Sequence, residues 1–169
     1  MSIGRSTNTP TDMAKSTPAT VALQNAGVAF TLHEYDYDNQ ADSVGLAAAA
    51  ALGESPGRVL KTLMTKVDGR PACAILPSDR ELSMKKLAQA LGGKSAQMMA
   101  PADAERLTGY KVGGISPFGQ MKRVPVMVEA GALAHALVYV NGGQRGLQVQ
   151  LAPAVLVALL GAAAADIVA

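Results

Sequence analysis

Residues 59–76, VLKTLMTKVDGRPACAIL, carry the strongest fold signal of the sequence. Two apolar segments flank Asp68-Gly69, and an Asp-Gly pair favours the tight two-residue turn of a β-hairpin. Because side chains alternate between the faces of a strand, the first segment places one set of residues on a single face. This set comprises Val59, Lys61, Leu63, Thr65 and Val67. A lysine is therefore expected within an otherwise mainly apolar stripe.

Helix caps and apolar periodicity predict further elements on both sides of this hairpin. The elements predicted before it are a helix from Thr17-Pro18 to Gly27, a strand over 28–35 and an alanine-rich helix from Ser43 to Gly53. The elements predicted directly after it are a helix capped by Ser83 that stops at Gly92-Gly93, a short strand around Gln97 and a helix from Pro101. The last predicted elements are a loop over 110–123, strands over 124–129, 136–140 and 147–151, and a closing helix from Pro153.

These elements follow no regular strand–helix–strand repeat. The expected fold class is therefore α+β, a single domain with a curved, mixed and mostly antiparallel sheet surrounded by helices. We assign this domain to residues 17–169. Residues 1–16 are expected to form a flexible N-terminal tail, because this end is rich in Ser, Thr and Pro and lacks apolar periodicity.

The composition excludes several classes of protein. Hydrophobic residues make up 49% of the 169 residues and charged residues 17%, so wholesale disorder is ruled out. The net charge of +2 is too small for non-specific polyanion binding to be the main activity. The single cysteine, Cys73, excludes an internal disulfide and a multi-cysteine zinc site, and its apolar segment predicts a buried, inert thiol. No segment resembles a membrane span or a signal peptide, and we expect a soluble cytoplasmic protein.

Common catalytic and metal-binding motifs are missing from the sequence. Residues 114–119 have the glycine spacing of a phosphate-binding P-loop, but Gln120 and Met121 stand where lysine and serine or threonine are required. Residues 36–40 begin like a calcium loop, but Ala41 occupies the position that needs glycine. The two histidines lie far apart in the sequence, and no GxSxG nucleophile motif is present. We therefore expect no metal, no cofactor and no obvious protein nucleophile.

Three features allow both a structural and a functional interpretation. Lys61 is either a lysine at a strand edge with its head in solvent, or a point charge that binds a phosphate or carbonyl oxygen at the mouth of a pocket. Gly113-Gly114, within GYKVGGISPFGQMKR (109–123), is either a surface turn or a source of backbone N–H groups for a developing oxyanion. NGGQRG (141–146) is mainly a hairpin connection.

The order of three motifs carries a family resemblance. Lys61-Thr62, TGYKVGGISPFGQMKR (108–123) and YVNGGQRGLQV (139–149) together resemble the YbaK-type aminoacyl-tRNA deacylases. These proteins are free-standing relatives of the editing domain of bacterial prolyl-tRNA synthetase. The similarity extends from about Thr17 to the C-terminus.

The resemblance implies a trans-editing enzyme that cleaves a wrong amino acid from the 3′-terminal adenosine of tRNA. Members similar to this chain remove cysteine from tRNA(Pro), and the thiol of the substrate is thought to attack its own ester. The implied partners are aminoacyl-tRNA and prolyl-tRNA synthetase, and neither DNA nor a membrane is expected as a partner. No cofactor or metal is implied.

The resemblance also assigns site residues. It implies catalytic roles for Lys61 and for Gly113, whose backbone faces the aminoacyl carbonyl. The implied substrate-binding residues are Tyr35, Thr62, Gly114, Ile115, Ser116, Asn141 and Gln148.

Two of these positions depart from the pattern of the cysteine-specific group, which has serine at the position of Asn141 and aspartate at that of Gln148. Both amides keep hydrogen-bonding capacity, but Gln148 lacks the negative charge. The specificity therefore stays open between cysteine and alanine on tRNA(Pro). A non-catalytic module that binds a tRNA end or a synthetase is an alternative, as is a small-molecule-binding domain.

Overall fold

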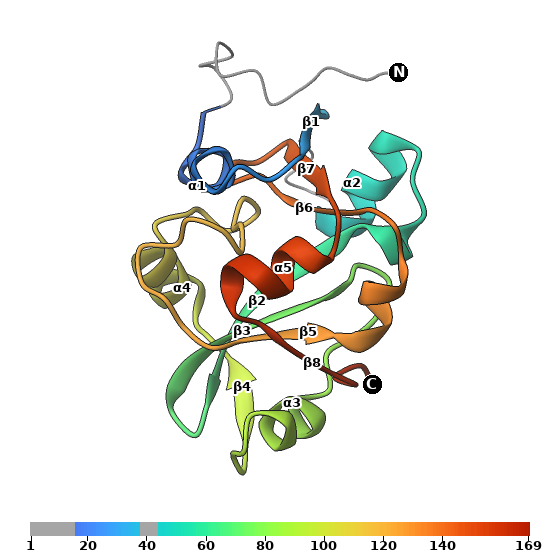
Figure 1. Cartoon of the computed structure of the whole chain (residues 1–169). Coiled ribbons are helices and arrows are strands. Elements are labelled where there is room, and N and C mark those ends of the chain that lie inside the picture. The colour runs from blue at the N-terminus through green and yellow to red at the C-terminus, as the bar shows by residue number, and fades with distance from the viewer. Residues whose placement is uncertain (1–15, 38–43) are drawn as a thin grey trace.

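Figure 1 shows the computed structural model, which describes residues 16–37 and 44–169. Most of the N-terminal segment expected to be a flexible tail, and the proposed cap Ser43, lie outside the described residues. Within the described ranges, no helix is long and apolar enough to cross a membrane.

The predicted hairpin forms the middle of a five-stranded sheet. Strands β2 (Leu60–Val67) and β3 (Arg70–Pro77) pair antiparallel along their whole length. Both turn residues are left-handed, with φ of 50° at Asp68 and 81° at Gly69, as a tight hairpin turn requires. The prediction from residues 59–76 is therefore confirmed.

The other strands extend this sheet in the order β4-β2-β3-β5-β8. Strand β4 (Ala96–Met98) is antiparallel to β2, whereas β5 (Val126–Glu129) is parallel to β3 and β8 (Ala163–Ala165) is parallel to β5. The closing helix predicted from Pro153 forms as a helix over 154–160, but strand β8 after it was not predicted. Three alanines carry little strand propensity, and they extend because the edge of β5 offers hydrogen bonds.

A second sheet of three antiparallel strands has the order β1-β7-β6. Strands β6 (Val138–Asn141) and β7 (Leu147–Leu151) form the second predicted hairpin. Strand β1 (Thr31–Glu34) is shorter than the predicted strand over 28–35, because its register with β7 begins at Thr31 and Val28 still donates to the carbonyl of Leu23. The α+β prediction with mostly antiparallel pairing is confirmed, and the strands are divided between two sheets.

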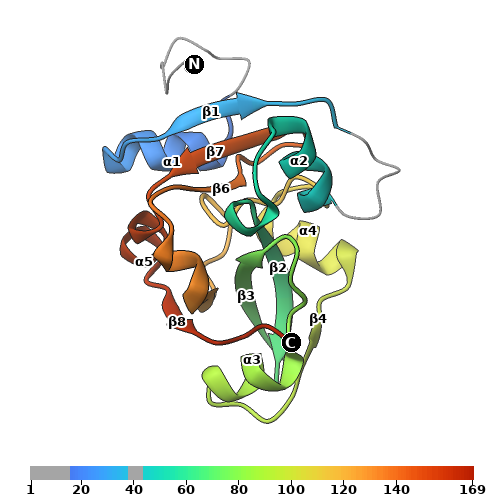
Figure 2. The same ribbon diagram turned by 90° about the vertical axis from the view of Figure 1, so that its right-hand side faces the viewer.

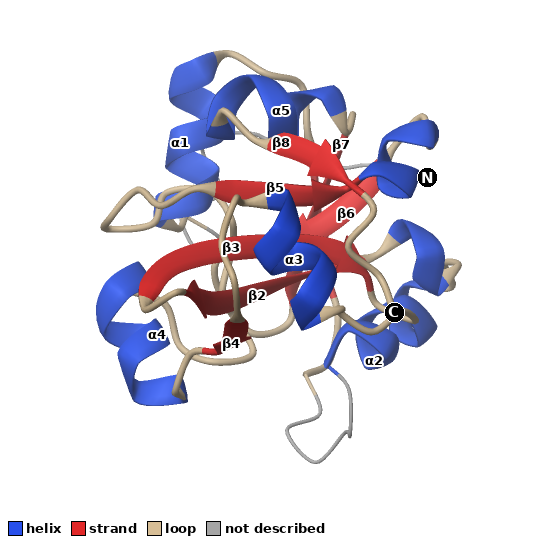
Figure 3. Ribbon diagram, turned by 90° about the horizontal axis from the view of Figure 1, so that it is seen from below, coloured by secondary structure: helices blue, strands red, loops and turns tan. Residues whose placement is uncertain are grey.

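Five α-helices and two 3-10 helices surround the sheets in the described part of the chain. The α-helices are α1 (Pro18–Ala26), α2 (Val44–Leu52), α3 (Met84–Ala90), α4 (Pro101–Thr108) and α5 (Ala154–Leu160). The 3-10 helices are η2 (Pro56–Arg58) and η3 (Ala130–Ala134). Figures 2 and 3 place α5 beside β8 at one edge of the larger sheet and α4 beside β4 at the other. The two described N-caps that were predicted, Thr17 and Ser83, both accept a backbone hydrogen bond.

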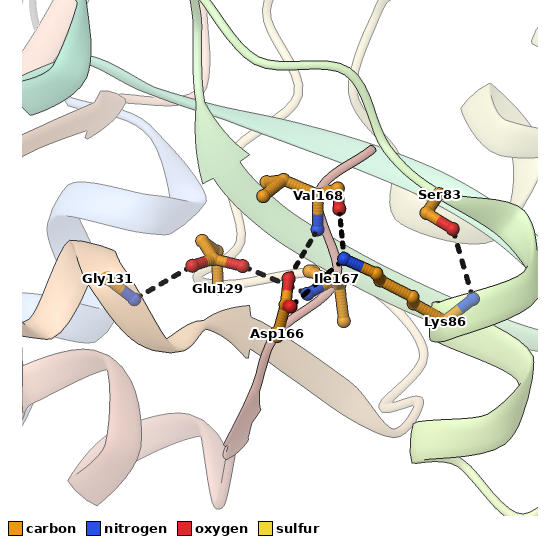
Figure 4. Close-up of polar contacts among 7 residues, drawn as sticks. All are labelled: Ser83, Lys86, Glu129, Gly131, Asp166, Ile167 and Val168. Atoms are coloured by element: carbon orange, nitrogen blue, oxygen red, sulfur yellow. Dashed lines mark hydrogen bonds and ion pairs between the residues drawn. The ribbon is translucent and has the colours of Figure 1, made fainter.

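The C-terminal segment after β8 is fastened by polar contacts, which Figure 4 shows. The backbone N–H of Ile167 donates to Oε1 of Glu129 at 2.9 Å. Lys86 Nζ donates to Asp166 Oδ2 at 3.0 Å and to the carbonyl of Val168 at 2.8 Å. Ile167 is fully buried in a cluster with Ala74, Leu87 and Met127, so the segment packs on one face of the larger sheet.

The loop over 110–123 packs into the main core, although it contains no regular secondary structure. The Phe118 side chain is only 2% exposed and packs with Leu23, Val140 and Leu156 in one apolar cluster. The Tyr110 hydroxyl donates to the carbonyl of Phe118 at 2.5 Å. The loop is therefore anchored from the inside.

Thr17 connects α1 to the β6–β7 hairpin. Its hydroxyl accepts from the backbone N–H of Thr20 at 3.1 Å and donates to the carbonyl of Gly142 at 2.5 Å. We expect Thr17→Ala to lower the free energy of unfolding by about 1–2 kcal/mol, because the cap and the contact with the hairpin are both lost. Urea denaturation measures this change.

Ser83→Ala is the matched control, since the Ser83 hydroxyl caps α3 through a single bond to the N–H of Lys86. Ser83→Ala should lower the free energy of unfolding by less than Thr17→Ala does. Equal losses would show that the bond from Thr17 to Gly142 adds nothing to stability.

Candidate active site

A cavity of about 330 Å³ lies beside β2, between the start of α2, the connection from β4 to α4, and the loop over 112–115. Figure 2 shows α2 and α4 near the upper end of β2. The apolar wall of the cavity is made mainly by Met64, Met98, Met99, Pro101, Ala104 and Ile115. The polar side chains on its wall are those of Lys61, Thr62, Asn141 and Gln148. A mostly apolar cavity with a few converging polar groups is the usual form of a ligand site.

Lys61 reaches this cavity from β2. Partial burial lowers the pKa of its ammonium group, and the carboxylates of Glu81 and Asp79 offset part of this effect. Neither carboxylate lies within salt-bridge distance, and Lys61 has no ion pair among the described residues. A half-buried cation without a counter-ion can bind an anionic group of a ligand.

The apolar stripe that was expected around Lys61 does not form. Val59 packs against Ala48 and Tyr139, while Val67 at the other end of the strand packs against Leu87 in a separate cluster. The strand twists through several environments, so alternation along one segment does not describe one continuous surface.

Two polar atoms of the cavity residues lack partners. The side-chain oxygens Thr62 Oγ1 and Gln148 Oε1 are buried and accept no hydrogen bond within the described part of the chain. Gln148 is only 3% exposed and lies between His33 and Asn141 in the smaller sheet. An unsatisfied buried polar group costs about 1–3 kcal/mol, so two of them beside one cavity favour a ligand that supplies donors.

Tyr35 does not line the cavity. Its hydroxyl is also buried without a hydrogen-bond partner of good geometry among the described residues. Burial raises the pKa of this hydroxyl, and the nearby Gln148 side chain offsets part of the shift. Tyr35 packs against the cluster that contains Ala48 and Tyr139. Tyr35 therefore lies near Gln148 but outside the cavity wall.

Gly113 and Gly114 occupy positions where a side chain would not fit. Gly113 has φ of 92°, and a Cβ atom there would lie 2.5 Å from Tyr37 Oη. A Cβ atom on Gly114 would lie 2.8 Å from the backbone nitrogen of Arg145. Gly113 lines the cavity, whereas Gly114 does not, and the N–H of Gly114 already donates to the carbonyl of Lys111 at 2.8 Å. Of the two amides expected to face a ligand, only that of Gly113 is free within the described residues.

Asn141 connects the β6–β7 hairpin to this loop. Its Nδ2 donates to the carbonyl of Gly113 at 3.3 Å, and its Oδ1 accepts from the N–H of Gly143 at 2.7 Å. Ser116 is fully buried, and its hydroxyl accepts from the N–H of Phe118 at 3.1 Å. Ser116 thus shapes the loop without reaching the cavity wall.

The structure brings six of the nine expected site residues together around one cavity, namely Lys61, Thr62, Gly113, Ile115, Asn141 and Gln148. The other three, Tyr35, Gly114 and Ser116, do not line it. The methionines of the wall and Gly45 were not predicted from the sequence. Gly45 approaches Ser78 so closely that a Cβ atom would lie 2.9 Å from the Oγ of Ser78. Nothing in the sequence separates a cavity methionine from a core methionine.

The described cavity wall contains no histidine, cysteine or carboxylate. Among the described residues, no three metal-ligating side chains come together. Cys73 lies in the core at 1% exposure, where burial raises the pKa of its thiol to about 12. The site can therefore supply positive charge, one free amide N–H and hydrogen-bond acceptors from its described residues.

The sequence profile of the aminoacyl-tRNA editing domain family matches residues 38–159. The chain belongs to this family. A protein of Enterococcus faecalis, provisionally named Cys-tRNA(Pro)/Cys-tRNA(Cys) deacylase EbsC, is 36% identical over 136 residues, which cover 79% of this chain and 83% of that protein. The multifunctional Ser/Thr-tRNA deacylase ProXp-y of Escherichia coli is 30% identical over 57% of this chain and 58% of its own length.

Longer proteins and solved structures are also similar to this editing domain. The proline–tRNA ligase of Nitratidesulfovibrio vulgaris is 39% identical over 71 residues, which cover 42% of this chain but only 12% of the ligase. The crystal structure of a provisionally assigned trans-editing enzyme for prolyl-tRNA synthetase has a TM-score of 0.80 at 24% identity, over 90% of this chain and 95% of that one. That structure supports the fold, and the family expected from the three sequence motifs is confirmed.

The buried thiol of Cys73 provides a test of the site chemistry. At a pKa of about 12, about one thiol in ten thousand is ionised at pH 8, and the core shields the sulfur from reagents. We expect native protein to react negligibly with Ellman's reagent at pH 8, and the reaction in urea to follow the unfolding transition. Rapid stoichiometric labelling of the native chain would make Cys73 a candidate nucleophile.

Proposed function

We propose that this editing domain acts in trans as a deacylase that removes cysteine from mischarged tRNA(Pro). The family supports aminoacyl-tRNA deacylation in general, and the likeness to EbsC supports a cysteine ester. The observation that carries the proposal is the cavity itself. Half-buried Lys61 lies there without an ion pair among residues 16–37 and 44–169, and two buried acceptors beside it have no partner in these ranges.

Lys61 is proposed to anchor the terminal phosphate or ribose of the tRNA 3′ end. Its low-polarity surroundings strengthen attraction to an anion, because water does not screen the pair as it does at the surface. Thr62 Oγ1 and Gln148 Oε1 are proposed to accept from the ammonium group of the aminoacyl ester. A neutral amide holds an ammonium group more weakly than a carboxylate would.

The chemical step is proposed to use the substrate's own thiol. The sulfur attacks the ester carbonyl carbon, and the bond from this carbon to the ribose 3′ oxygen breaks. The proton of the thiol ends on that oxygen, so the products are a four-membered thiolactone and tRNA with a free 3′ hydroxyl. The free N–H of Gly113 is proposed to stabilise the developing oxyanion. The protein then contributes orientation and charge stabilisation, which fits a described wall without a nucleophile or general base.

Alanine on tRNA(Pro) is the second candidate substrate, because Asn141 and Gln148 differ from the cysteine-specific pattern. Alanine has no thiol, so its ester would need water as the nucleophile. Prolyl-tRNA synthetase is the proposed partner that supplies tRNA discrimination, since a net charge of +2 leaves little for tight unaided binding of whole tRNA.

Lys61→Met tests the proposed function. On tRNA(Pro) charged with cysteine, alanine, serine or proline, we expect the unmodified protein to cleave the cysteine ester fastest. The variant should lose about 100-fold or more of this rate, because the anion anchor is gone. Its melting temperature should not fall, because burial disfavours the charged lysine and methionine has a similar shape.

Lys66→Met is the matched control for this variant. Lys66 lies on the same strand but outside the cavity wall, with its ammonium group 3.9 Å from Asp103. This control should keep full activity. If the unmodified protein cleaves the alanine ester fastest, the proposed specificity changes from cysteine to alanine. If it cleaves no ester, a module that only binds a tRNA end is favoured.

Gln148→Glu tests the proposed ammonium contact. The substitution keeps the shape and adds a negative charge, so KM for the cysteine ester should fall several-fold. Gln150→Glu, on the same strand but outside the cavity wall, is the control and should leave KM unchanged. Equal KM values for the two variants would remove Gln148 from the ammonium site.

A further inference from the structure

Three successive peptide groups of the loop, from Lys111 to Gly114, differ in whether both their C=O and their N–H are hydrogen-bonded. In the first group, the carbonyl of Lys111 accepts from Gly114 and the N–H of Val112 donates to Glu105 Oε2 at 2.8 Å. In the third group, the carbonyl of Gly113 accepts from Asn141 and the N–H of Gly114 donates to Lys111. Both ends of these two groups are therefore occupied.

The middle peptide group, between Val112 and Gly113, is occupied at one end only. The carbonyl of Val112 accepts from Nε of Arg145 at 2.9 Å. The N–H of Gly113 has no partner among the described residues. Of the six polar ends of these three peptide groups, one donor thus remains free among the described residues, and both Val112 and Gly113 line the cavity.

The geometry of the peptide bond links this free donor to Arg145. The described chain contains no cis peptide bond, so the C=O and N–H of each group point in opposite directions. A guanidinium that holds the Val112 carbonyl on one side of the loop therefore directs the Gly113 N–H to the other side. Arg145 is absent from the cavity wall, whereas Gly113 forms part of it, which favours the cavity as the direction of the Gly113 N–H.

Arg145 is itself held in place by contacts with a third segment. Its guanidinium carbon lies 5.4 Å from the centre of the Tyr37 ring. The backbone of the β6–β7 hairpin, from which Arg145 projects, packs so closely on Gly114 that only glycine fits there. The hairpin, the loop and the segment after β1 thus meet at one guanidinium.

We propose that Arg145 is a positioning residue that aims and polarises the Val112–Gly113 peptide group. The guanidinium fixes the peptide plane, and its positive charge draws electron density toward the Val112 oxygen. The N–H at the opposite end becomes a stronger donor, because linked hydrogen bonds polarise one another. The inference rests on the proposed function, in which the Gly113 N–H stabilises the oxyanion.

Single-turnover kinetics test this role on whichever aminoacyl ester the unmodified protein cleaves. Loss of a complete oxyanion donor lowers the rate about 100- to 1000-fold in other enzymes, so a misaimed donor should lower it about 10- to 100-fold. We expect that loss of maximal rate for Arg145→Ala, with KM changed less than about two-fold. Arg145→Lys should recover part of the rate, and added methylguanidinium should restore part of it to Arg145→Ala.

Lys111→Ala is the control, because it removes one positive charge beside the same peptide group without releasing the Val112 carbonyl. This variant should keep its maximal rate. An unchanged maximal rate in Arg145→Ala would overturn the inference. A rate loss that neither lysine nor methylguanidinium repairs would overturn it as well, since a general disturbance of the loop would then be the cause.

The amide resonance of Gly113 separates this inference from the proposed function. In the ¹⁵N-labelled full chain, the Gly113 cross-peak should move in Arg145→Ala, return toward its original position with methylguanidinium, and move little in Lys111→Ala. An inactive protein with this pattern would reject the proposed deacylase function and keep the role of Arg145 in aiming the amide. An unmoved cross-peak would overturn that role even if the protein is an active deacylase.

Discussion

Burial of Phe118 in the main core is the interaction on which the site depends. The loop over 110–123 has no strand or helix hydrogen bonds of its own, so its path is set by what it packs against. Phe118 places the middle of the loop, and the Tyr110 hydroxyl ties the start of the loop to that point. Gly119 passes so close to the backbone of Pro18 that a Cβ atom there would lie 2.5 Å from the carbonyl of that residue. The first turn of α1 therefore limits where the loop can lie.

The β6–β7 hairpin completes this arrangement from the opposite side. Thr17 donates to Gly142, and Asn141 donates to Gly113 across the cavity wall. Three segments that are remote in the sequence are thus joined by short polar contacts around the loop. Each of these contacts restricts the positions that the neighbouring segment can take, since close-packed interiors deform little. This rigidity suits a site whose proposed task is orientation and charge stabilisation.

The cavity also lowers the stability of the fold. Within the described ranges, Lys61 is partly desolvated without an ion pair, and the buried oxygens of Thr62 and Gln148 lack donors. Each unsatisfied oxygen costs about 1–3 kcal/mol, a large part of the net stability of a domain. An apolar residue at position 61 would avoid the desolvation of the lysine ammonium group. Retention of these groups together in one cavity is easier to explain by a ligand than by folding.

Local sequence determined much of this protein. The Asp68-Gly69 turn, the caps at Thr17 and Ser83 and the strand over 147–151 depend on neighbouring residues, and all of them were predictable. Sequence motifs also indicated the family and six residues of one cavity. Tertiary structure alone decided that β8 forms, that the strands divide between two sheets and that the Gly113 amide stays free while that of Gly114 does not. Whether a polar group is satisfied depends on partners such as Arg145 and Asn141, which lie about 30 residues away in the sequence, and only the folded chain brings them to the loop.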